Sequence, residues 1–335
     1  MFTRRAFVSA AAGCAGLLGC RYSVADSAGR GGDFQKGVNF TAERPDKYES
    51  AGARSRLAAL AEYGVNSVAL VPYGWCRLGS PDLRFDGQRS WERDTAIETL
   101  AQVARSNGMK VFLKPQIWVP RGFPGELEFE RPEERAVWFS RYEAFLRHYA
   151  TLAARIGADL FSVGVEFSRL ARYEDQWRRL IALARGWYSG PLVYAANWGR
   201  EFESIGFWDA LDLIGLNNYY PLPDDLAVDG VVSTVAAVQR RFNRPVIFPE
   251  AGFPSIKDPH REPWAEPERA ISLEDQARCY EAVFAGFYNQ PWFHGVYWWK
   301  VGSNGRGGAG DASHTPWRKP AMEVVRTWYT RGQPG

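Results

Sequence analysis

The stretch RPVIFPEAGFP, residues 244–254, carries one charged side chain at the end of an apolar run. The β-branched and aromatic residues from Val246 to Phe248 predict a buried strand of a parallel sheet. The Gly and Pro that follow predict a loop. Glu250 therefore stands at the C-terminal end of a buried strand, where a carboxylate is unfavourable unless it is paired or has a chemical role.

A second stretch, Leu160–Phe167 (LFSVGVEF), has the same form and ends at Glu166. Alternation along the first stretch predicts that Glu250 shares a face with Val246 and Phe248. Two glutamates at the ends of two buried strands are what a glycosidase requires. Either glutamate alone is better explained as a helix cap or a structural ion pair, but the pair favours catalysis.

The N-terminus has the features of a bacterial export signal. Arg4 and Arg5 precede an apolar run over residues 6–18, as in a twin-arginine signal. The sequence LLGC, residues 17–20, resembles a lipobox, in which Cys20 is lipidated and becomes the first residue of the mature chain. The alternative is a signal cleaved without lipidation, or a short N-terminal helix. We expect a signal peptide over residues 1–19, a flexible tether over 20–34 and one catalytic domain over 35–335.

The charge balance limits the partners of the domain. Removal of Arg4 and Arg5 with the signal lowers the 41 basic residues to 39, against 38 acidic residues. A nearly neutral domain is not typical of nucleic-acid-binding proteins. The four His residues are scattered and no C-x-x-C motif occurs, so no metal or other cofactor is expected. We expect an exported monomer, periplasmic or at the cell surface, that contacts a membrane only through its lipid anchor.

Short apolar segments alternate with amphipathic ones along the rest of the chain. The predicted strands are Gly37–Phe40, Asn66–Cys76, Lys110–Val119, Leu160–Phe167, Pro191–Trp198, Leu213–Pro221, the strand that ends at Glu250, and His294–Val301. The predicted helices are Arg54–Tyr63, Glu92–Ser106, Pro132–Ile156, Tyr173–Arg185, Phe202–Leu211, Val231–Phe242, Leu273–Phe287 and Pro320–Tyr329. Strands separated by helices pair in parallel, so this series predicts a single (β/α)8 TIM barrel. A doubly wound sheet is the alternative, and it also places both glutamates at one edge.

In such barrels the chemistry lies at the C-terminal ends of the strands. Lys114 falls at one of these ends, where a lysine that points inward must pair with a carboxylate or contact substrate. Tyr219 is placed to orient Glu250 through its hydroxyl. Trp198 and Trp299 also fall at strand ends, and an indole face can stack on a sugar ring. We expect about half of the strand-end tryptophans to be packing residues instead.

The ordered set of motifs resembles retaining glycosidases of clan A, and most closely glycoside hydrolase family 113. The pieces that carry the resemblance are KGVNF (36–40), LKP (113–115), GVE (164–166), LNNYYPL (216–222), FPEAGF (248–253), GVYWW (295–299) and KPA (319–321). They run in family order over about residues 35–330. Each piece is short, and the specificity lies in their order.

This resemblance implies a (β/α)8 barrel with Glu166 as acid/base, Glu250 as nucleophile, and β-mannan as substrate. Many clan members have Asn directly before the acid/base, where this chain has Val165. The hydrogen bond to the sugar 2-hydroxyl must then come from elsewhere, and we expect Asn197 to supply it. The choice between mannan, glucan and xylan stays open. So does an inactive carbohydrate-binding lipoprotein, although such a protein has no reason to keep both glutamates.

The lipobox gives a direct prediction. Cell fractionation should find the protein in the membrane fraction, and Cys20→Ser should release or mislocalise it, because a bacterial lipoprotein is held by the acyl chains on that cysteine. Membrane association that is unchanged in Cys20→Ser would contradict the prediction.

Overall fold

The computed structural model describes residues 34–44, 47–88, 90–265 and 269–331, so the predicted signal and nearly all of the tether lie outside the described residues. The strands are β1 (Gln35–Thr41), β2 (Ser67–Leu70), β3 (Tyr73–Trp75), β4 (Lys110–Leu113), β5 (Gln116–Trp118), β6 (Leu160–Val165), β7 (Leu192–Asn197), β8 (Leu213–Asn218), β9 (Val246–Ala251) and β10 (Phe293–Gly302). The helices are α1 (Ala51–Ala59), α2 (Asp94–Ser106), α3 (Pro132–Arg155), α4 (Glu174–Trp187), α5 (Arg200–Ser204), α6 (Asp229–Phe242), α7 (Leu273–Phe287) and α8 (Pro320–Thr330). Short 3-10 turns cover Leu60–Tyr63, Pro124–Glu126, Leu170–Arg172, Phe207–Ala210 and Pro259–Arg261.

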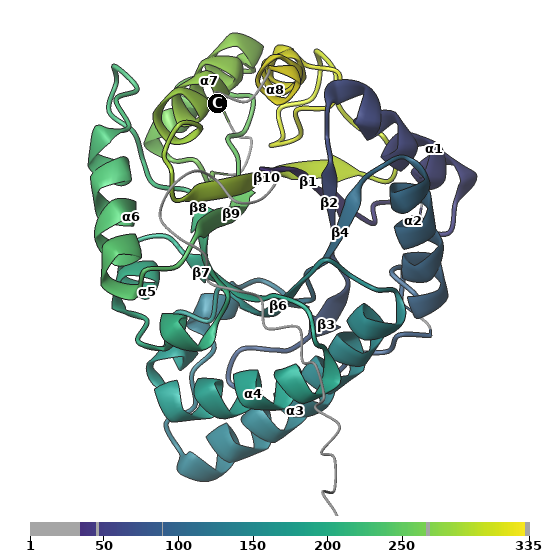
Figure 1. Cartoon of the computed structure of the whole chain (residues 1–335), viewed down its shortest axis with the longest axis vertical. Helices are drawn as coiled ribbons and strands as arrows, with labels where there is room; N and C mark the ends of the chain where they lie inside the picture. Colours follow the sequence, from purple (N-terminus) through teal and green to yellow (C-terminus); the bar gives the residue numbers. More distant parts are fainter. Residues whose placement is uncertain (1–33, 45–46, 89, 266–268, 332–335) are drawn as a thin grey trace, which may run out of the picture.

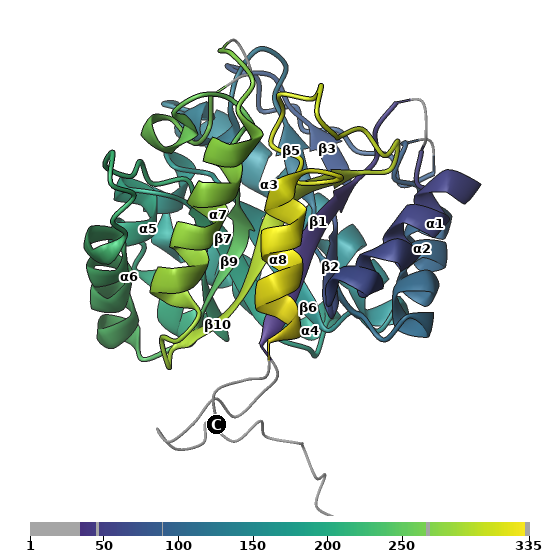
Figure 2. The same ribbon diagram turned by 90° about the horizontal axis from the view of Figure 1, so that it is seen from above.

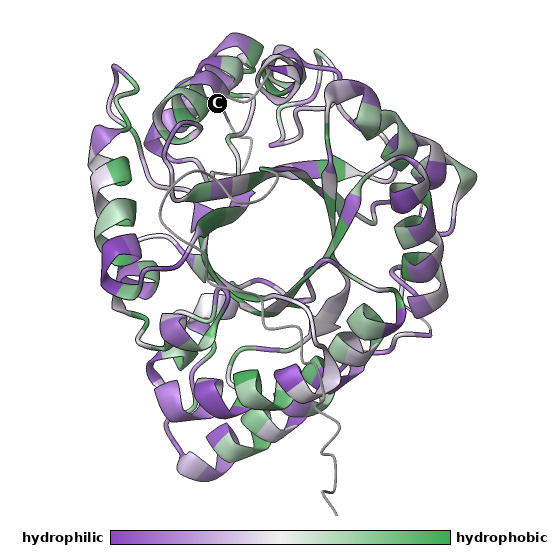
Figure 3. Cartoon of the chain, viewed as in Figure 1, coloured by the Kyte–Doolittle hydropathy of each residue, from purple (hydrophilic) through white to green (hydrophobic). Residues whose placement is uncertain are grey.

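Eight of these strands form a closed parallel barrel in the order β1, β10, β9, β8, β7, β6, β4, β2. Figure 1 looks down this barrel and shows the helices as an outer ring. Figure 3 shows apolar colour along much of the barrel wall and more polar colour on the outer parts of the helices. The predicted (β/α)8 barrel is therefore confirmed, and the doubly wound alternative is excluded because the sheet closes on itself.

Local signals set the ends of several helices. The Ser50 hydroxyl caps α1 by accepting from the backbone N–H of Ala53 at 3.0 Å, and Ser272 caps α7 in the same way. After α2, Gly108 takes a φ of 74°, in the left-handed region that glycine tolerates best. The predicted start of α7 and the predicted end of α2 agree with these caps, whereas α1 begins at Ala51, three residues before the predicted start at Arg54.

A separate layer of side chains fills the inside of the barrel. It consists of Ala69, Phe112, Leu160, Val193, Leu213, Ile247 and Tyr297, all of them buried. The Tyr297 hydroxyl donates to Oε1 of Gln35 at 2.7 Å and lies 2.6 Å from the Ser67 hydroxyl, so its polar end is satisfied. The barrel is thus a packed core, and the inward positions of its strands can be read from these residues.

Two of the predicted strands are shorter than expected. Asn66–Cys76 divides into β2 and β3, and Lys110–Val119 divides into β4 and β5. Pro72 and Pro115 stand at the breaks, where proline has no N–H for the ladder. β3 and β5 form a separate two-stranded sheet, and Figure 2 shows them at the upper end of the barrel. Trp75 and Trp118 therefore lie on this small sheet and not at the ends of barrel strands.

The predicted face of the Glu250 strand is also wrong. Ile247 belongs to the barrel interior, whereas Phe248 packs on Phe287 of α7 with ring centroids 4.8 Å apart. The pairing of β8 with β9 shifts register between Ile247 and Glu250, where Pro249 stands. Such an irregularity turns the following side chain to the opposite face. Glu250 consequently points inward with Ile247, and not to the side of Phe248.

No helix among the described residues is long and apolar enough to span a membrane.

The close approach of β7 and β8 yields a stability prediction. A Cβ at Gly215 would lie 2.3 Å from the carbonyl oxygen of Tyr194, so Gly215→Ala should shift the strands below the site and cost roughly 1–3 kcal/mol or more. Gly186 in α4 has open space around it, and Gly186→Ala should be neutral or stabilising by up to about 1 kcal/mol. Urea unfolding of both variants checks this, and equal effects would contradict it.

Candidate active site

Glu250 lies near the C-terminal end of β9 and is only 4% exposed. Its Oε1 accepts hydrogen bonds from the Lys114 ammonium and, at 2.6 Å, from Nε2 of Gln116. Its Oε2 accepts from the Tyr219 hydroxyl at 3.1 Å. Each oxygen of the carboxylate has a donor, and the Lys114 ammonium balances its charge, so the side chain is held in one orientation.

Lys114 follows β4 directly and is fully buried. Burial lowers the pKa of its ammonium, and the contact with Glu250 opposes that shift. Of the two alternatives that the sequence left for an inward lysine, the structure shows the pairing with a carboxylate. The indole of Trp299 lies beside the same group, with the Lys114 Nζ 5.0 Å from the ring centroid.

Glu166 follows β6 directly and takes a φ of 58°, a left-handed conformation that is uncommon outside glycine. Its backbone N–H donates to the carbonyl oxygen of Ala195 on β7 at 2.8 Å, which holds this turn in place. The pairing of β6 with β7 also shifts register between Ser162 and Val165. Strain of this kind is found at functional sites when the surrounding structure enforces it.

The two glutamates have different surroundings. The carboxylate of Glu166 accepts from an amide, Nδ2 of Asn217, at 3.0 Å, whereas Glu250 accepts from an ammonium. Burial raises the pKa of Glu166 to about 8, and the charge of Glu250 adds to this effect, although Asn217 opposes it. Glu166 is therefore suited to hold a proton near neutral pH, beside a carboxylate that is paired with a cation.

Asn217 links the two halves of the site. It pairs in register with Glu250 across β8 and β9 and with Asn197 across β7 and β8. Its side-chain amide also donates to Glu166. Asn217 therefore contacts one glutamate through its side chain and pairs with the other through its backbone. Glu250 on β9 and Glu166 after β6 are separated in the barrel by β7 and β8, and Asn217 on β8 lies between them.

The structure places the other predicted substrate-binding residues at the same end of the barrel. Asn197 is the last residue of β7, and its side chain is partly exposed. Trp198 stacks on Trp264 at 4.9 Å with an interplanar angle of 18°, and Trp264 is 46% exposed. Trp299 is partly exposed, but Trp298 is fully buried and stacks on Tyr280, as expected for a packing tryptophan.

Three residues of the site were not singled out from the sequence. Gln116 touches Glu250 and Asn217 touches Glu166. The sequence does contain a signal for both. Gln116 lies two residues after Lys114, and Asn217 lies two residues before Tyr219, so strand alternation places each on the same face as a predicted site residue. Glu201, a buried residue of α5, has no comparable signal because its role depends on contacts with two other segments.

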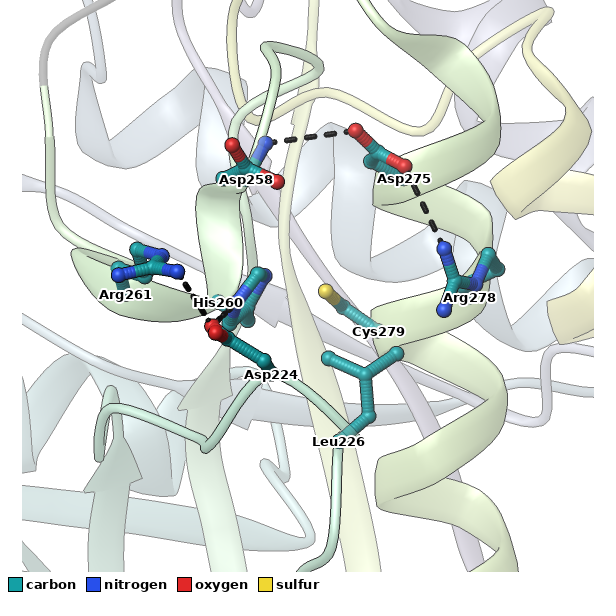
Figure 4. A pocket seen from close by; sticks show the side chains of 8 residues that line it. All are labelled: Asp224, Leu226, Asp258, His260, Arg261, Asp275, Arg278 and Cys279. Atoms are coloured by element: carbon teal, nitrogen blue, oxygen red, sulfur yellow. Dashed lines mark hydrogen bonds and ion pairs between the residues drawn. The ribbon is translucent and has the colours of Figure 1, made fainter.

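A cavity of about 190 Å³ lies elsewhere, between the loops after β8 and β9 and α7 (Figure 4). Its lining residues are Asp224, Leu226, Asp258, His260, Arg261, Asp275, Arg278 and Cys279. Asp224 pairs with Arg261 at 2.6 Å and Asp275 with Arg278 at 3.7 Å. Burial raises the pKa of the Cys279 thiol to about 12, which makes it a poor nucleophile. The cavity contains none of the predicted site residues, and four of its charged side chains form these two ion pairs.

Among the residues that the structure describes, no group of three or more His, Cys, Asp or Glu side chains could hold a metal ion. Two carboxylates with unlike partners lie at the mouth of the barrel. Such a pair at the C-terminal ends of barrel strands is typical of a glycoside hydrolase.

The comparisons with known proteins agree. The model of Glycoside Hydrolase Family 113 matches residues 38–307. A β-mannanase of this family from Alicyclobacillus acidocaldarius, solved in complex with ManMIm, is 32% identical, with a TM-score of 0.83 over 90% of this chain and 99% of its own. A second structure, a β-1,4-mannanase of the family, is 27% identical, with a TM-score of 0.82 over 89% of this chain and 100% of its own.

The β-glucuronidase of Ruminococcus gnavus is 16% identical, with a TM-score of 0.64 over 89% of this chain and 50% of its own, so it shares the fold alone. No curated protein matches the chain. The extent of the family match and the identity to the first mannanase show that this chain belongs to glycoside hydrolase family 113. It is therefore a β-glycosidase, as the sequence motifs indicated.

The raised pKa of Glu166 predicts a pH-dependent cost to stability. The folded state holds this proton more tightly than the unfolded chain, so stability falls as the pH rises from about 4.5 to about 8. Glu166→Gln should remove that loss and make the variant more stable than the wild type at pH 8 by roughly 1–3 kcal/mol, with little difference at pH 4. Urea unfolding at both pH values measures this. The exposed Glu274, changed to Gln, is the control, and parallel pH profiles for both variants would contradict the prediction.

Proposed function

We propose that this protein is a retaining β-mannanase in which Glu250 is the nucleophile and Glu166 is the acid/base. The observation that supports this most is the contrast between the two glutamates. Glu250 is paired with an ammonium and a phenol, while Glu166 has a raised pKa and an amide partner. The similarity to two β-mannanases supports mannan over glucan or xylan as substrate.

In the first step a carboxylate oxygen of Glu250 attacks the anomeric carbon while the bond from that carbon to the leaving oxygen breaks. Glu166 donates its proton to the leaving oxygen. In the second step Glu166 takes a proton from water, the water oxygen bonds to the anomeric carbon, and Glu250 leaves as a carboxylate. The pKa of Glu166 follows the charge on Glu250, since loss of that charge in the covalent intermediate favours the ionised acid/base.

Other residues are assigned to substrate binding. Lys114 and Tyr219 hold Glu250, and both are also assigned to the hydroxyls of the sugar being cleaved. Asn197 is assigned to the sugar 2-hydroxyl, in place of the Asn that many clan members have at the position of Val165. Trp299 forms the floor under that sugar, beside Lys114, and Trp198 with Trp264 presents an exposed aromatic face to a further sugar unit.

We also propose that the enzyme is exported and held on a membrane by lipid on Cys20. The export signal and the lipobox support this, and both lie outside the described residues.

The stereochemistry of the first product tests the mechanism. Retention requires carboxyl groups roughly 5–5.5 Å apart, whereas inversion requires roughly 6.5–9.5 Å. NMR of wild-type digests of a β-mannan should show the β-anomer first. Glu250→Ala should lose hydrolysis by at least about 10³-fold but form an α-glycosyl azide when azide and an activated aryl β-mannoside are supplied.

Glu274→Ala, a change in an exposed carboxylate of α7, is the control and should keep wild-type activity. An α-anomer as the first product would overturn the retaining mechanism even if both glutamates proved essential. Absence of cleavage of mannan, together with cleavage of glucan or xylan, would overturn the substrate. Absence of any cleavage with substrate still bound would favour a carbohydrate-binding protein.

A further inference from the structure

A third carboxylate, that of Glu201, lies close behind Glu166. Glu201 stands on α5 and is 4% exposed. Its Oε1 accepts from the Tyr194 hydroxyl at 2.6 Å. Its Oε2 accepts from the Ser168 hydroxyl at 2.6 Å and from the backbone N–H of Asn197 at 3.1 Å. Both oxygens of this buried carboxylate are therefore hydrogen-bonded, and the three donors form a polar network around it.

This network holds the turn that carries Glu166. The N–H of Glu166 donates to Ala195 on β7 at 2.8 Å, and the N–H of Phe167 donates to the Tyr194 hydroxyl at 3.0 Å. The Ser168 hydroxyl then donates to Glu201. Three successive residues after β6 are thus tied to β7 and α5, and two of these ties pass through Glu201 or its partner Tyr194. The positive φ of Glu166 is enforced by these contacts.

Glu201 also places a negative charge near Glu166. Among the described residues, no Lys, Arg or His forms an ion pair with it. The groups that face it are the hydroxyls of Tyr194 and Ser168 and the backbone N–H groups of Asn197 and Phe167, with Glu166 as the neighbouring carboxylate. Burial raises the pKa of Glu201 to about 7, and its negative charge contributes to the raised pKa of Glu166.

We propose that Glu201 is a positioning residue, which holds the turn that carries the acid/base Glu166 and places a second buried carboxylate near it. This inference rests on the proposed function, because Glu201 can have this role only if Glu166 transfers the proton. Glu250 receives its donors from other segments, Lys114, Gln116 and Tyr219, so Glu201 should not act on the nucleophile.

The dependence of rate on the leaving group separates this role from a merely structural one. Aryl β-mannosides with poor leaving groups need the proton of Glu166 in the first step, whereas a dinitrophenyl glycoside does not. Glu201→Gln keeps the size of the side chain but replaces one acceptor oxygen with a donor. We expect kcat/KM for poor leaving groups to fall roughly 10- to 100-fold, and kcat/KM for the dinitrophenyl glycoside to change by less than about 3-fold.

The pH profile is the second readout. Loss of the charge of Glu201 lowers the pKa of Glu166, so the alkaline limb of kcat/KM should move to lower pH by roughly half a unit or more. Ser168→Ala removes one donor without touching the core, and it should show the same leaving-group dependence to a smaller extent. Glu274→Gln, the same chemical change at an exposed carboxylate of α7, is the control and should change neither readout.

Two results would overturn the inference. If Glu201→Gln, or Ser168→Ala where the first variant does not fold, lowers kcat/KM equally for all leaving groups, Glu201 is only structural. If Glu166→Ala itself shows no leaving-group dependence, Glu166 is not the acid/base, and both the proposed function and this inference fail. Thermal unfolding of each variant shows whether it is folded in the assay.

Discussion

The site depends on how a buried carboxylate is made stable. Glu250 is almost fully buried, and such a group is costly unless charge and hydrogen bonds compensate for the lost water. The compensation comes from Lys114, Gln116 and Tyr219, of which the first two lie more than 130 residues before Glu250. These segments meet only when the barrel closes. The buried carboxylate of Glu250 is therefore stabilised only in the closed barrel. A change that weakens barrel closure should also disturb the contacts of Glu250, and the reverse should hold.

The second constraint is the asymmetry between the carboxylates. Glu166 has a neutral amide as partner and other carboxylates nearby, so its environment favours the proton, whereas Glu250 has the only ammonium in contact with either carboxylate among the described residues. A glycosidase needs this division, because one group must give a proton while the other stays charged. Glu201 adds to this asymmetry, because its hydrogen bonds hold the turn of Glu166 and do not involve the donors of Glu250. The family match and this division of environments point to the same chemistry.

The functional residues stand where regular structure is interrupted. Register shifts precede both Glu166 and Glu250, and Glu166 takes a left-handed backbone conformation. Pro115 separates Lys114 from Gln116 and moves the chain from the barrel to the small sheet of β3 and β5, yet both side chains reach the same oxygen of Glu250. Irregularities of this kind re-aim side chains at the ends of strands, and they are expected at functional sites.

The sequence by itself determined the class of fold, because strand and helix periods alternate eight times, and it placed both glutamates, Lys114 and Tyr219 at strand ends. It also carried the ordered motifs of the family. Tertiary structure decided which residues touch. Alternation assigned Glu250 to the face of Phe248, but the register shift at Pro249 turns it inward, and such a shift depends on the pairing with β8. The contacts of Asn217 with Glu166 and of Glu201 with Ser168 join separate segments. Local periodicity reports which side of a strand a residue occupies, whereas these contacts depend on how separate strands and loops are aligned in the closed barrel.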